Sequence, residues 1–200
     1  MSVTGILGGG PAGLLMAILL ARRGERVRVY ERRPDPRHTA PEAGRSINLA
    51  LASRGIRALT EAGVMPRLSD ALVPMRGRML HDLQGQSQFV AYGQDARESI
   101  HSISRTELAR RLVEAAADTP GIELHFAQRC IGLDAAGEPV LRDETTGREY
   151  APSAARWIGA DGECGVGEFD GGGDDIGVGG CNRGEHDGGS RCRTLTIPSR

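Results

Sequence analysis

A glycine-rich turn between an apolar strand and an apolar helix most constrains how this chain can fold. The run Gly8–Gly13 satisfies the pattern G-x-G-x-x-G. It follows the short apolar segment Val3–Leu7, typical of a buried strand, and it leads into Pro11–Arg23, whose apolar residues recur at helical spacing. Val27–Tyr30 alternates valine with other side chains and is predicted to be a second strand. This order predicts a βαβ unit and an α/β fold of the Rossmann type.

Each residue of the turn has its own physical reason. Gly8 allows the tight turn from strand to helix, and Gly10 lets the backbone approach a pyrophosphate. Gly13 lets the helix pack closely against the sheet. Pro11 fits a first helical position, where its missing N–H costs nothing, and Ala12 follows it. The helix N-terminus then offers free N–H groups and a positive dipole end to phosphates. The turn therefore predicts a dinucleotide site.

The motif alone leaves the identity of the nucleotide open. Glu31 lies 18 residues after Gly13, near the position of an acidic residue that binds ribose hydroxyls. Arg32 and Arg33 follow it directly and could instead meet a 2′-phosphate, which would favour NADP.

Composition excludes several other classes of function. All 25 basic residues are arginine, which excludes a lysine Schiff base and a P-loop lysine. The formal net charge of −1 gives no general attraction to nucleic acid or anionic membranes. The four cysteines form no C-x-x-C pair, so no metal site is predicted. The apolar run Leu14–Leu20 is too short to span a bilayer, and we expect a cytoplasmic protein.

The remaining pattern predicts further elements as far as Gly162. Ser104–Glu107 matches a capping box at the start of a helix that runs to Ala117. After Gly162 the periodicity stops, and residues 162–200 contain twelve glycines. We therefore expect residues 163–200 to be a disordered or frameshifted tail. The other predicted elements are a helix over Ser53–Gly63, strands over Arg76–Leu83, Phe89–Tyr92, Ile122–Phe126 and Ala155–Ala160, and a hairpin over Val140–Glu149.

Several segments resemble the kynurenine 3-monooxygenase family, one of the single-component FAD-dependent aromatic hydroxylases. These are Gly44–Leu51, Pro74–His81, Ala91–Gly93 and Ser102–Arg105, with His125-Phe126 further on. The resemblance covers residues 8–162 and favours FAD over NADP at the glycine turn. It implies a Rossmann-like FAD-binding domain of the glutathione-reductase type over residues 1–162. Part of an antiparallel substrate sheet would be inserted at about residues 72–103, and the chain would be incomplete relative to the family.

The resemblance also assigns roles to individual residues. Arg78 and Tyr92 match the family's pair that binds the carboxylate of L-kynurenine. Without the resemblance, Arg78 would be interpreted as a solvated strand arginine, as Arg76 is, and Tyr92 as an aromatic residue on the face of a sheet. Asp161-Gly162 matches a motif that supports the pyrophosphate region, but Glu163–Gly167 departs from the family pattern. Cys130 would lie near the adenine end of FAD. The predicted cofactor-binding residues are Gly8, Gly10, Pro11, Ala12, Gly13, Glu31, Arg32, Ala50, Arg105, Cys130, Asp161 and Gly162.

The activity implied by the resemblance is NADPH-dependent ortho-hydroxylation of an aromatic amine, with FAD as cofactor and NADPH as co-substrate. No side chain is predicted to be a catalytic acid or base, and His81, His101 and His125 are expected to be structural. Two alternatives stay open: another FAD-dependent hydroxylase or reductase with the same fold, and a non-enzymatic FAD-binding fragment. In either case we expect this chain alone to bind FAD weakly and to be inactive.

Overall fold

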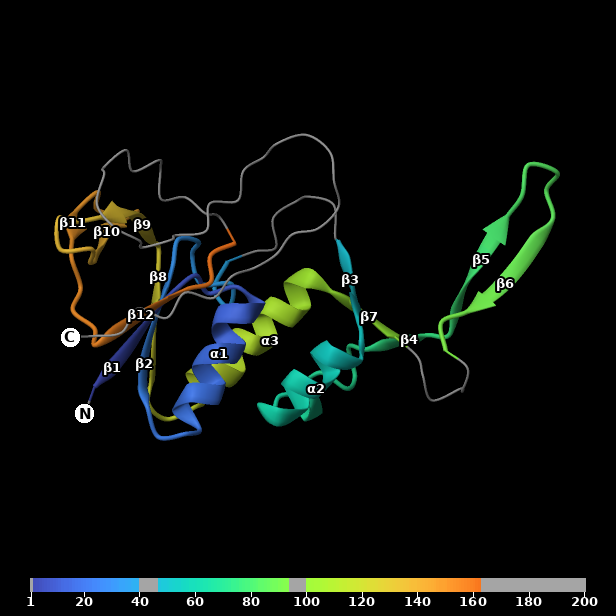
Figure 1. The fold of residues 1–200 in the computed structure, drawn as a ribbon, viewed down its shortest axis with the longest axis horizontal. Helices are drawn as coiled ribbons and strands as arrows, with labels where there is room; N and C mark the ends of the chain where they lie inside the picture. The colour runs from blue at the N-terminus through green and yellow to red at the C-terminus, as the bar shows by residue number, and fades with distance from the viewer. Residues whose placement is uncertain (1, 40–46, 94–99, 163–200) are drawn as a thin grey trace, which may run out of the picture.

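A four-stranded parallel sheet forms the centre of the fold in this computed structural model, which describes residues 2–39, 47–93 and 100–162 (Figure 1). Its strands are β1 (Val3–Leu7), β2 (Arg26–Glu31), β8 (Ile122–Phe126) and β12 (Arg156–Gly159). The spatial order is β12-β1-β2-β8, so the chain adds two strands on one side of β1 and the last strand on the other. This order creates a topological switch point between β1 and β12, which is where open α/β sheets bind their ligands.

Two helices, α1 (Pro11–Ala21) and α3 (Arg105–Ala117), cover one face of the parallel sheet (Figure 1). The sequence of α1 is apolar on all sides, because the helix packs against both the sheet and α3. Ile6, Val27 and Val29 pack against α1 from the sheet, and each is at most 1 % exposed. Burying side chains of this size stabilises the fold by roughly 1.5–3 kcal/mol each. The strongly apolar helix of the sequence is therefore a core element.

An antiparallel meander covers part of the opposite face of the sheet. It consists of β9 (Gln128–Leu133), β10 (Pro139–Asp143) and β11 (Glu149–Tyr150). Trp157 lies over Gly5, which has no Cβ to obstruct the indole, and its Nε1 donates a hydrogen bond to Glu138 at 2.7 Å. The ring of Tyr30 stacks on His125 with 4.9 Å between the ring centroids. Burial raises the pKa of Tyr30. The two faces of the sheet are thus packed by different kinds of element.

A second, antiparallel sheet extends the structure beyond α3. It contains β3 (Asn48–Leu51), β4 (Val73–Met75) and β7 (Ile100–Ser104), in the order β3-β7-β4. Helix α2 (Ser53–Glu61) and the 3-10 helix η1 (Met65–Arg67) follow β3 along the chain. Leu51, Leu59, Val64, Leu68 and Ile103 from these elements form one buried core together with residues of α1 and α3. The second sheet is therefore anchored to the helical layer.

The hairpin of β5 (Gly77–His81) and β6 (Ser87–Ala91) projects away from the parallel sheet (Figure 1). The Asp82 carboxylate closes its turn by accepting hydrogen bonds from the N–H groups of Gln84 and Gln86, at 3.0 and 2.7 Å. Met79 and Phe89 lie opposite each other in the register, and both are 56 % exposed. The hairpin is thus closed by local hydrogen bonds and leaves its apolar side chains largely in solvent.

The capping-box prediction at α3 is wrong. Ser104 is the N-cap residue, but its side chain makes no capping hydrogen bond. The Glu107 carboxylate instead pairs with two arginines of the same helix, 2.7 Å from Arg110 and 2.5 Å from Arg111. Hydrogen bonds from Arg110 and Arg111 lower the pKa of Glu107 to about 2. Two guanidinium partners therefore outcompete a single backbone N–H for this carboxylate.

Four short strands, β3, β4, β7 and β9, were not predicted from the sequence, whereas the other main elements lie close to their predicted bounds. The predicted tail, residues 163–200, lies outside the described residues, so its disorder and the division into 1–162 and 163–200 stay predictions. Within the described ranges, no helix combines the length and apolar character needed to cross a membrane. The same residues contain no group of three or more His, Cys, Asp or Glu side chains that could hold a metal ion.

Candidate functional site

The turn between β1 and α1 needs glycine at Gly8. This residue has a φ of +105°, which L side chains rarely adopt. A Cβ atom there would lie 2.5 Å from the backbone nitrogen of Asp161, just after β12. The N–H of Gly8 donates to the Tyr30 carbonyl at 2.8 Å, which fixes the turn against β2. Gly8 therefore permits both the bend and the close approach of the chain that follows β12.

Gly13 and Gly10 serve different purposes in the same turn. A Cβ atom on Gly13 would collide with the carbonyl oxygen of Gly8, so this glycine allows α1 to pack onto the turn. At Gly10, by contrast, no described atom lies within 4 Å of where a Cβ atom would be. Gly10 is the N-cap of α1, and the described first turn of this helix contains neither a side-chain cap nor an acidic residue. The backbone at Gly10 thus faces open space beside free helix N–H groups, which suits an anionic phosphate.

Glu31, at the end of β2, is held by backbone N–H groups. Its Oε2 accepts a hydrogen bond from Gly9 at 2.7 Å, and its Oε1 accepts one from Arg33 at 2.9 Å. A Cβ atom on Gly9 would lie 2.8 Å from the Cβ of Glu31. Sequence reasoning missed Gly9, because the pattern treats its position as variable. The run of three glycines was the signal, since only a glycine allows this contact between the turn and β2.

The predicted residues that follow β1, β2 and β12 meet at one edge of the parallel sheet. Gly8–Gly13 follows β1, Glu31 and Arg32 lie at the end of β2, and Asp161-Gly162 follows β12. All of these strands run parallel, so their carboxyl ends lie together. The contact of Gly8 with Asp161 and that of Gly9 with Glu31 show that the three segments touch.

Arg105 and Ala50 lie on the helical side of this edge. Arg105 is the first residue of α3, and its N–H donates to the Ile47 carbonyl at 3.0 Å. Because α3 leads into β8, which is parallel to β2, its N-terminus lies towards the carboxyl edge of the sheet. Ala50 pairs with Ser102 in the neighbouring sheet, and both predicted residues are exposed.

Cys130 lies on β9, in the meander. Burial raises the pKa of its thiol, and the charge of Asp161 raises it further. The thiol donates a weak hydrogen bond to the Gly132 carbonyl at 3.6 Å. Just before β9, the N–H of Ala127 donates to the Arg33 carbonyl at 3.0 Å, which ties the start of the meander to the end of β2. The thiol is therefore kept protonated, and a binding role for Cys130 would be one of packing.

Arg78 and Tyr92, the predicted substrate residues, lie on the β5–β6 hairpin. Arg78 pairs with Val90, so Tyr92 is diagonal to Arg78 on the same face. Tyr92 is 44 % exposed, and Arg78 is also exposed. The hairpin projects away from the parallel sheet (Figure 1). The structure thus brings most of the predicted cofactor residues together and places the predicted substrate pair on a separate element.

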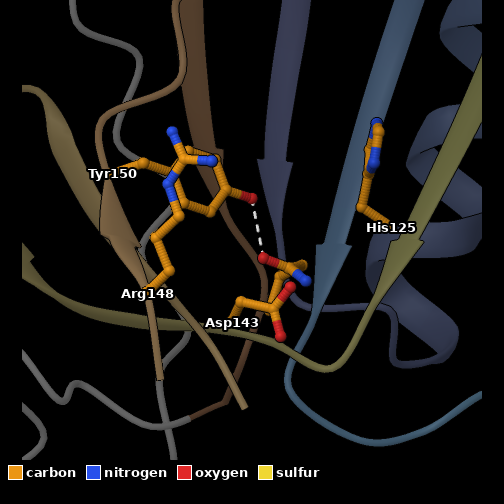
Figure 2. A pocket seen from close by; sticks show the side chains of 5 residues that line it. His125, Asp143, Arg148 and Tyr150 are labelled. Carbon is orange, nitrogen blue, oxygen red and sulfur yellow. Dashed lines mark hydrogen bonds between the residues drawn. The ribbon is translucent and has the colours of Figure 1, made fainter. Parts of the chain in front are cut away.

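A small polar pocket of about 230 Å³ lies against the meander (Figure 2). The Tyr150 hydroxyl donates to Gln128 Oε1 at 2.7 Å across it. Hydrogen bonds from Thr145 and then Thr146 lower the pKa of Asp143. His125, Gln128, Asp143, Arg148 and Tyr150 line the pocket, and none of them belongs to the predicted cofactor or substrate residues. The carboxyl edge, where backbone N–H groups and a fixed carboxylate converge, is the better candidate site.

Comparison with known sequences shows which family the chain belongs to. Residues 1–168 match the family model described as FAD binding domain. The chain is 46 % identical over 161 residues to kynurenine 3-monooxygenase of Stenotrophomonas maltophilia, covering 78 % of this chain and 34 % of that protein. It is 39 % identical over 157 residues to kynurenine 3-monooxygenase of Legionella pneumophila, covering 78 % and 35 %. The chain therefore spans about a third of the length of these relatives.

Solved structures share the fold. The flavin-dependent monooxygenase PieE, in complex with FAD and substrate, aligns with a TM-score of 0.65 at 23 % identity, covering 81 % of this chain and 30 % of PieE. An oxygenase of 2-methyl-3-hydroxypyridine-5-carboxylic acid aligns with a TM-score of 0.64 at 21 % identity, covering 83 % and 41 %. The predicted fold class and the resemblance stated from the sequence are both confirmed, as is FAD as the cofactor. With its glycine turn, fixed Glu31 and matching family model, the chain belongs to the FAD-binding domain family.

Proposed function

We propose that this chain is the FAD-binding part of an FAD- and NADPH-dependent monooxygenase that hydroxylates L-kynurenine. The observation that carries the proposal is the sequence identity of 39–46 % to proteins named kynurenine 3-monooxygenase, over 78 % of this chain. The convergence of the glycine turn, Glu31 and Asp161 at the switch point supports a dinucleotide site of the kind this reaction needs. A role in kynurenine degradation and a cytoplasmic location belong to the same proposal.

The residues at the carboxyl edge would hold FAD, which when bound supplies the redox and oxygen chemistry. Free N–H groups at the start of α1 bind the pyrophosphate, and Gly10 leaves room for it to approach. Glu31, whose orientation is fixed by Gly9 and Arg33, would accept hydrogen bonds from the adenosine ribose. Asp161 would support the pyrophosphate region, and Arg105 would contact FAD. These residues bind and orient the cofactor, and no proton transfer is assigned to them.

Arg78 and Tyr92 would bind the substrate carboxylate. A guanidinium can donate two parallel hydrogen bonds to a carboxylate, and a phenol adds one directional donor. Neither side chain has a hydrogen-bond or ion-pair partner among the described residues, so both donors are available. Binding of the carboxylate by Arg78 and Tyr92 would fix the position of the aromatic ring relative to the cofactor.

The test is equilibrium dialysis of the chain against L-kynurenine in the presence of FAD. Arg78→Ala should remove a charge-assisted hydrogen bond worth roughly 1.5–3 kcal/mol, which weakens binding about 10- to 150-fold. Tyr92→Phe should cost about 1 kcal/mol. Arg57→Ala is the matched control, because Arg57 is an exposed arginine on α2, away from the hairpin. FAD binding should be the same in all variants.

Two outcomes would contradict the proposal. Equal losses from Arg78→Ala and Arg57→Ala would remove the assigned substrate site. Tight binding of an aromatic compound without a carboxylate would instead indicate another hydroxylase or reductase of the same fold. The same dialysis, with FAD as the titrant, tests the prediction that this chain alone binds FAD weakly. A stoichiometric complex that survives gel filtration would overturn that prediction.

A further inference from the structure

The register of the hairpin places a second arginine beside the predicted substrate pair. Gly77 pairs with Ala91, and the ladder continues one step further, because the N–H of Tyr92 donates to the Arg76 carbonyl at 3.0 Å. Arg76 therefore lies directly opposite Tyr92, whereas Arg78 lies diagonally from it. From the sequence, Arg76 was expected to be only a solvated strand arginine.

Arg76 and Tyr92 lie just beyond β5 and β6, and alternation continued across this hydrogen bond puts both arginines and Tyr92 on one face of the hairpin. The opposite face is identified independently by Gly77, where the ring of Phe89 occupies the space that a Cβ atom would take. Phe89 and its partner Met79 therefore lie on the Gly77 face. Arg76 and Arg78 flank Gly77 in the chain, so they point away from this apolar face and towards the side of Tyr92.

The face that carries the two arginines concentrates positive charge. Residues two apart in a strand are about 7 Å from each other, so both guanidinium groups can reach one carboxylate. No described acidic side chain pairs with Arg76 or Arg78. The nearest acidic residue in sequence, Asp82, already accepts two N–H groups within its own turn. A carboxylate held between the guanidinium groups would satisfy donors from both.

We propose that Arg76 is a further substrate-binding residue and that Arg76, Arg78 and Tyr92 together form a three-donor site for the carboxylate of an aromatic substrate. This inference rests on the proposed function for the identity of the substrate, but not for the anion site itself. The direct pairing of Arg76 with Tyr92 makes it the better placed of the two arginines to share a carboxylate oxygen with the phenol.

The experiment compares ligands with and without a carboxylate. The full chain with FAD is dialysed against L-kynurenine and against kynuramine, which keeps the ring and amine but lacks the carboxylate. Arg76→Ala should weaken L-kynurenine binding about tenfold and leave kynuramine binding unchanged, as expected for loss of one charge-assisted bond. Arg76→Lys should recover only part of the loss, because lysine keeps the charge but not the two-pronged geometry. A purely structural effect of Arg76→Ala would weaken both ligands equally and would overturn the inference.

A second measurement separates this inference from the proposed function. Benzoate is titrated into the chain while the Nε–H NMR signals of Arg76 and Arg78, assigned from the alanine variants, are followed. Both signals should shift together, and that of Arg57 should not. If both shift but L-kynurenine does not bind, the anion site stands and the proposed substrate falls. If Arg78→Ala abolishes the preference for L-kynurenine while Arg76→Ala preserves it, the proposed function stands and Arg76 has no part in it. The inference also fails if benzoate leaves the Arg76 signal unmoved.

Discussion

The parallel sheet and the β5–β6 hairpin bury their apolar side chains to very different extents. Ile6 and Val29 of the sheet are 0 and 1 % exposed, whereas Met79 and Phe89 of the hairpin are both 56 % exposed. Helices cover one face of the parallel sheet and the meander covers part of the other, whereas the hairpin forms a separate sheet of only two strands. Alternation along a strand determines which side chains share a face, but burial requires another layer to cover that face.

The same two regions also treat their arginines differently. Near the parallel sheet and α3, some guanidinium groups have acidic partners: Arg28 lies 2.8 Å from Glu123, and Arg111 lies 2.5 Å from Glu107. On the hairpin, Arg76 and Arg78 have no such partner among the described residues. Paired arginines contribute to the fold, and unpaired arginines on an exposed face are available for an anionic ligand.

The largest expected difference between the two regions is in the cost of removing a leucine. Leu14, on α1, is fully buried in the core, whereas Leu80, on β5, is 43 % exposed. Leu14→Ala should lower the free energy of unfolding by about 2–5 kcal/mol, because it leaves a cavity. Leu80→Ala should lower it by less than about 1 kcal/mol. Urea unfolding followed by circular dichroism measures both. Similar losses would show that the hairpin packs as tightly as the core.

A smaller but sharper effect is expected at the glycines of the turn. Gly13→Ala should cost about 1–3 kcal/mol of stability, because the new methyl group would overlap the Gly8 carbonyl oxygen. Gly10→Ala should change stability by less than about 1 kcal/mol, since its φ of −72° suits alanine and its surroundings are open. Thermal unfolding and FAD titration are measured for both variants.

The two glycine variants should separate packing from binding. Gly10→Ala should weaken FAD binding by tenfold or more while leaving the fold intact, because its methyl group would enter the space of the pyrophosphate. Unchanged FAD affinity in Gly10→Ala would show that the cofactor does not approach this backbone. A stable Gly13→Ala variant would show that α1 can move away from the turn.

Local patterns explain which parts of the fold could be predicted. The βαβ unit and the glycine turn are encoded within about thirty consecutive residues, so their positions followed from the sequence. The strands β3, β4 and β7 are short and find their partners far along the chain, as when Asn48 pairs with Ser104. Their pairing depends on non-local contacts that no local period reveals.

Three details of the site and its surroundings depend on contacts in three dimensions that the sequence did not reveal. At α3, the capping-box pattern was present, but the neighbouring arginines took the Glu107 carboxylate. On the hairpin, Arg76 and Arg78 looked alike, and only the register showed that Arg76 faces Tyr92 directly. At the turn, Gly9 occupied a variable position of the motif although its backbone holds Glu31. Each of these depends on which of several available partners is closest in three dimensions.

The smallest expected effect concerns the paired charges of the helical layer and their dependence on pH. Arg110 and Arg111 lower the pKa of Glu107 from 4.5 to about 2, so the folded state binds the proton less readily than the unfolded state. The stabilisation from Glu107 is therefore fully present above about pH 4.5, and it is lost as the pH falls towards 2. Glu107→Gln should lower stability by about 1 kcal/mol at pH 7, as expected for a partly exposed carboxylate with two arginine partners. Urea unfolding of both proteins between pH 7 and 2 should show this difference shrinking below pH 4.5 and nearly vanishing by pH 2. Gln88→Glu is the comparison variant, because Gln88 lies on the hairpin face of Arg78. The added carboxylate should increase stability only slightly, because exposed ion pairs contribute little. It should, however, compete with L-kynurenine for the arginines. A difference between wild type and Glu107→Gln that stayed constant with pH would mean that Glu107 contributes through packing rather than through its charge.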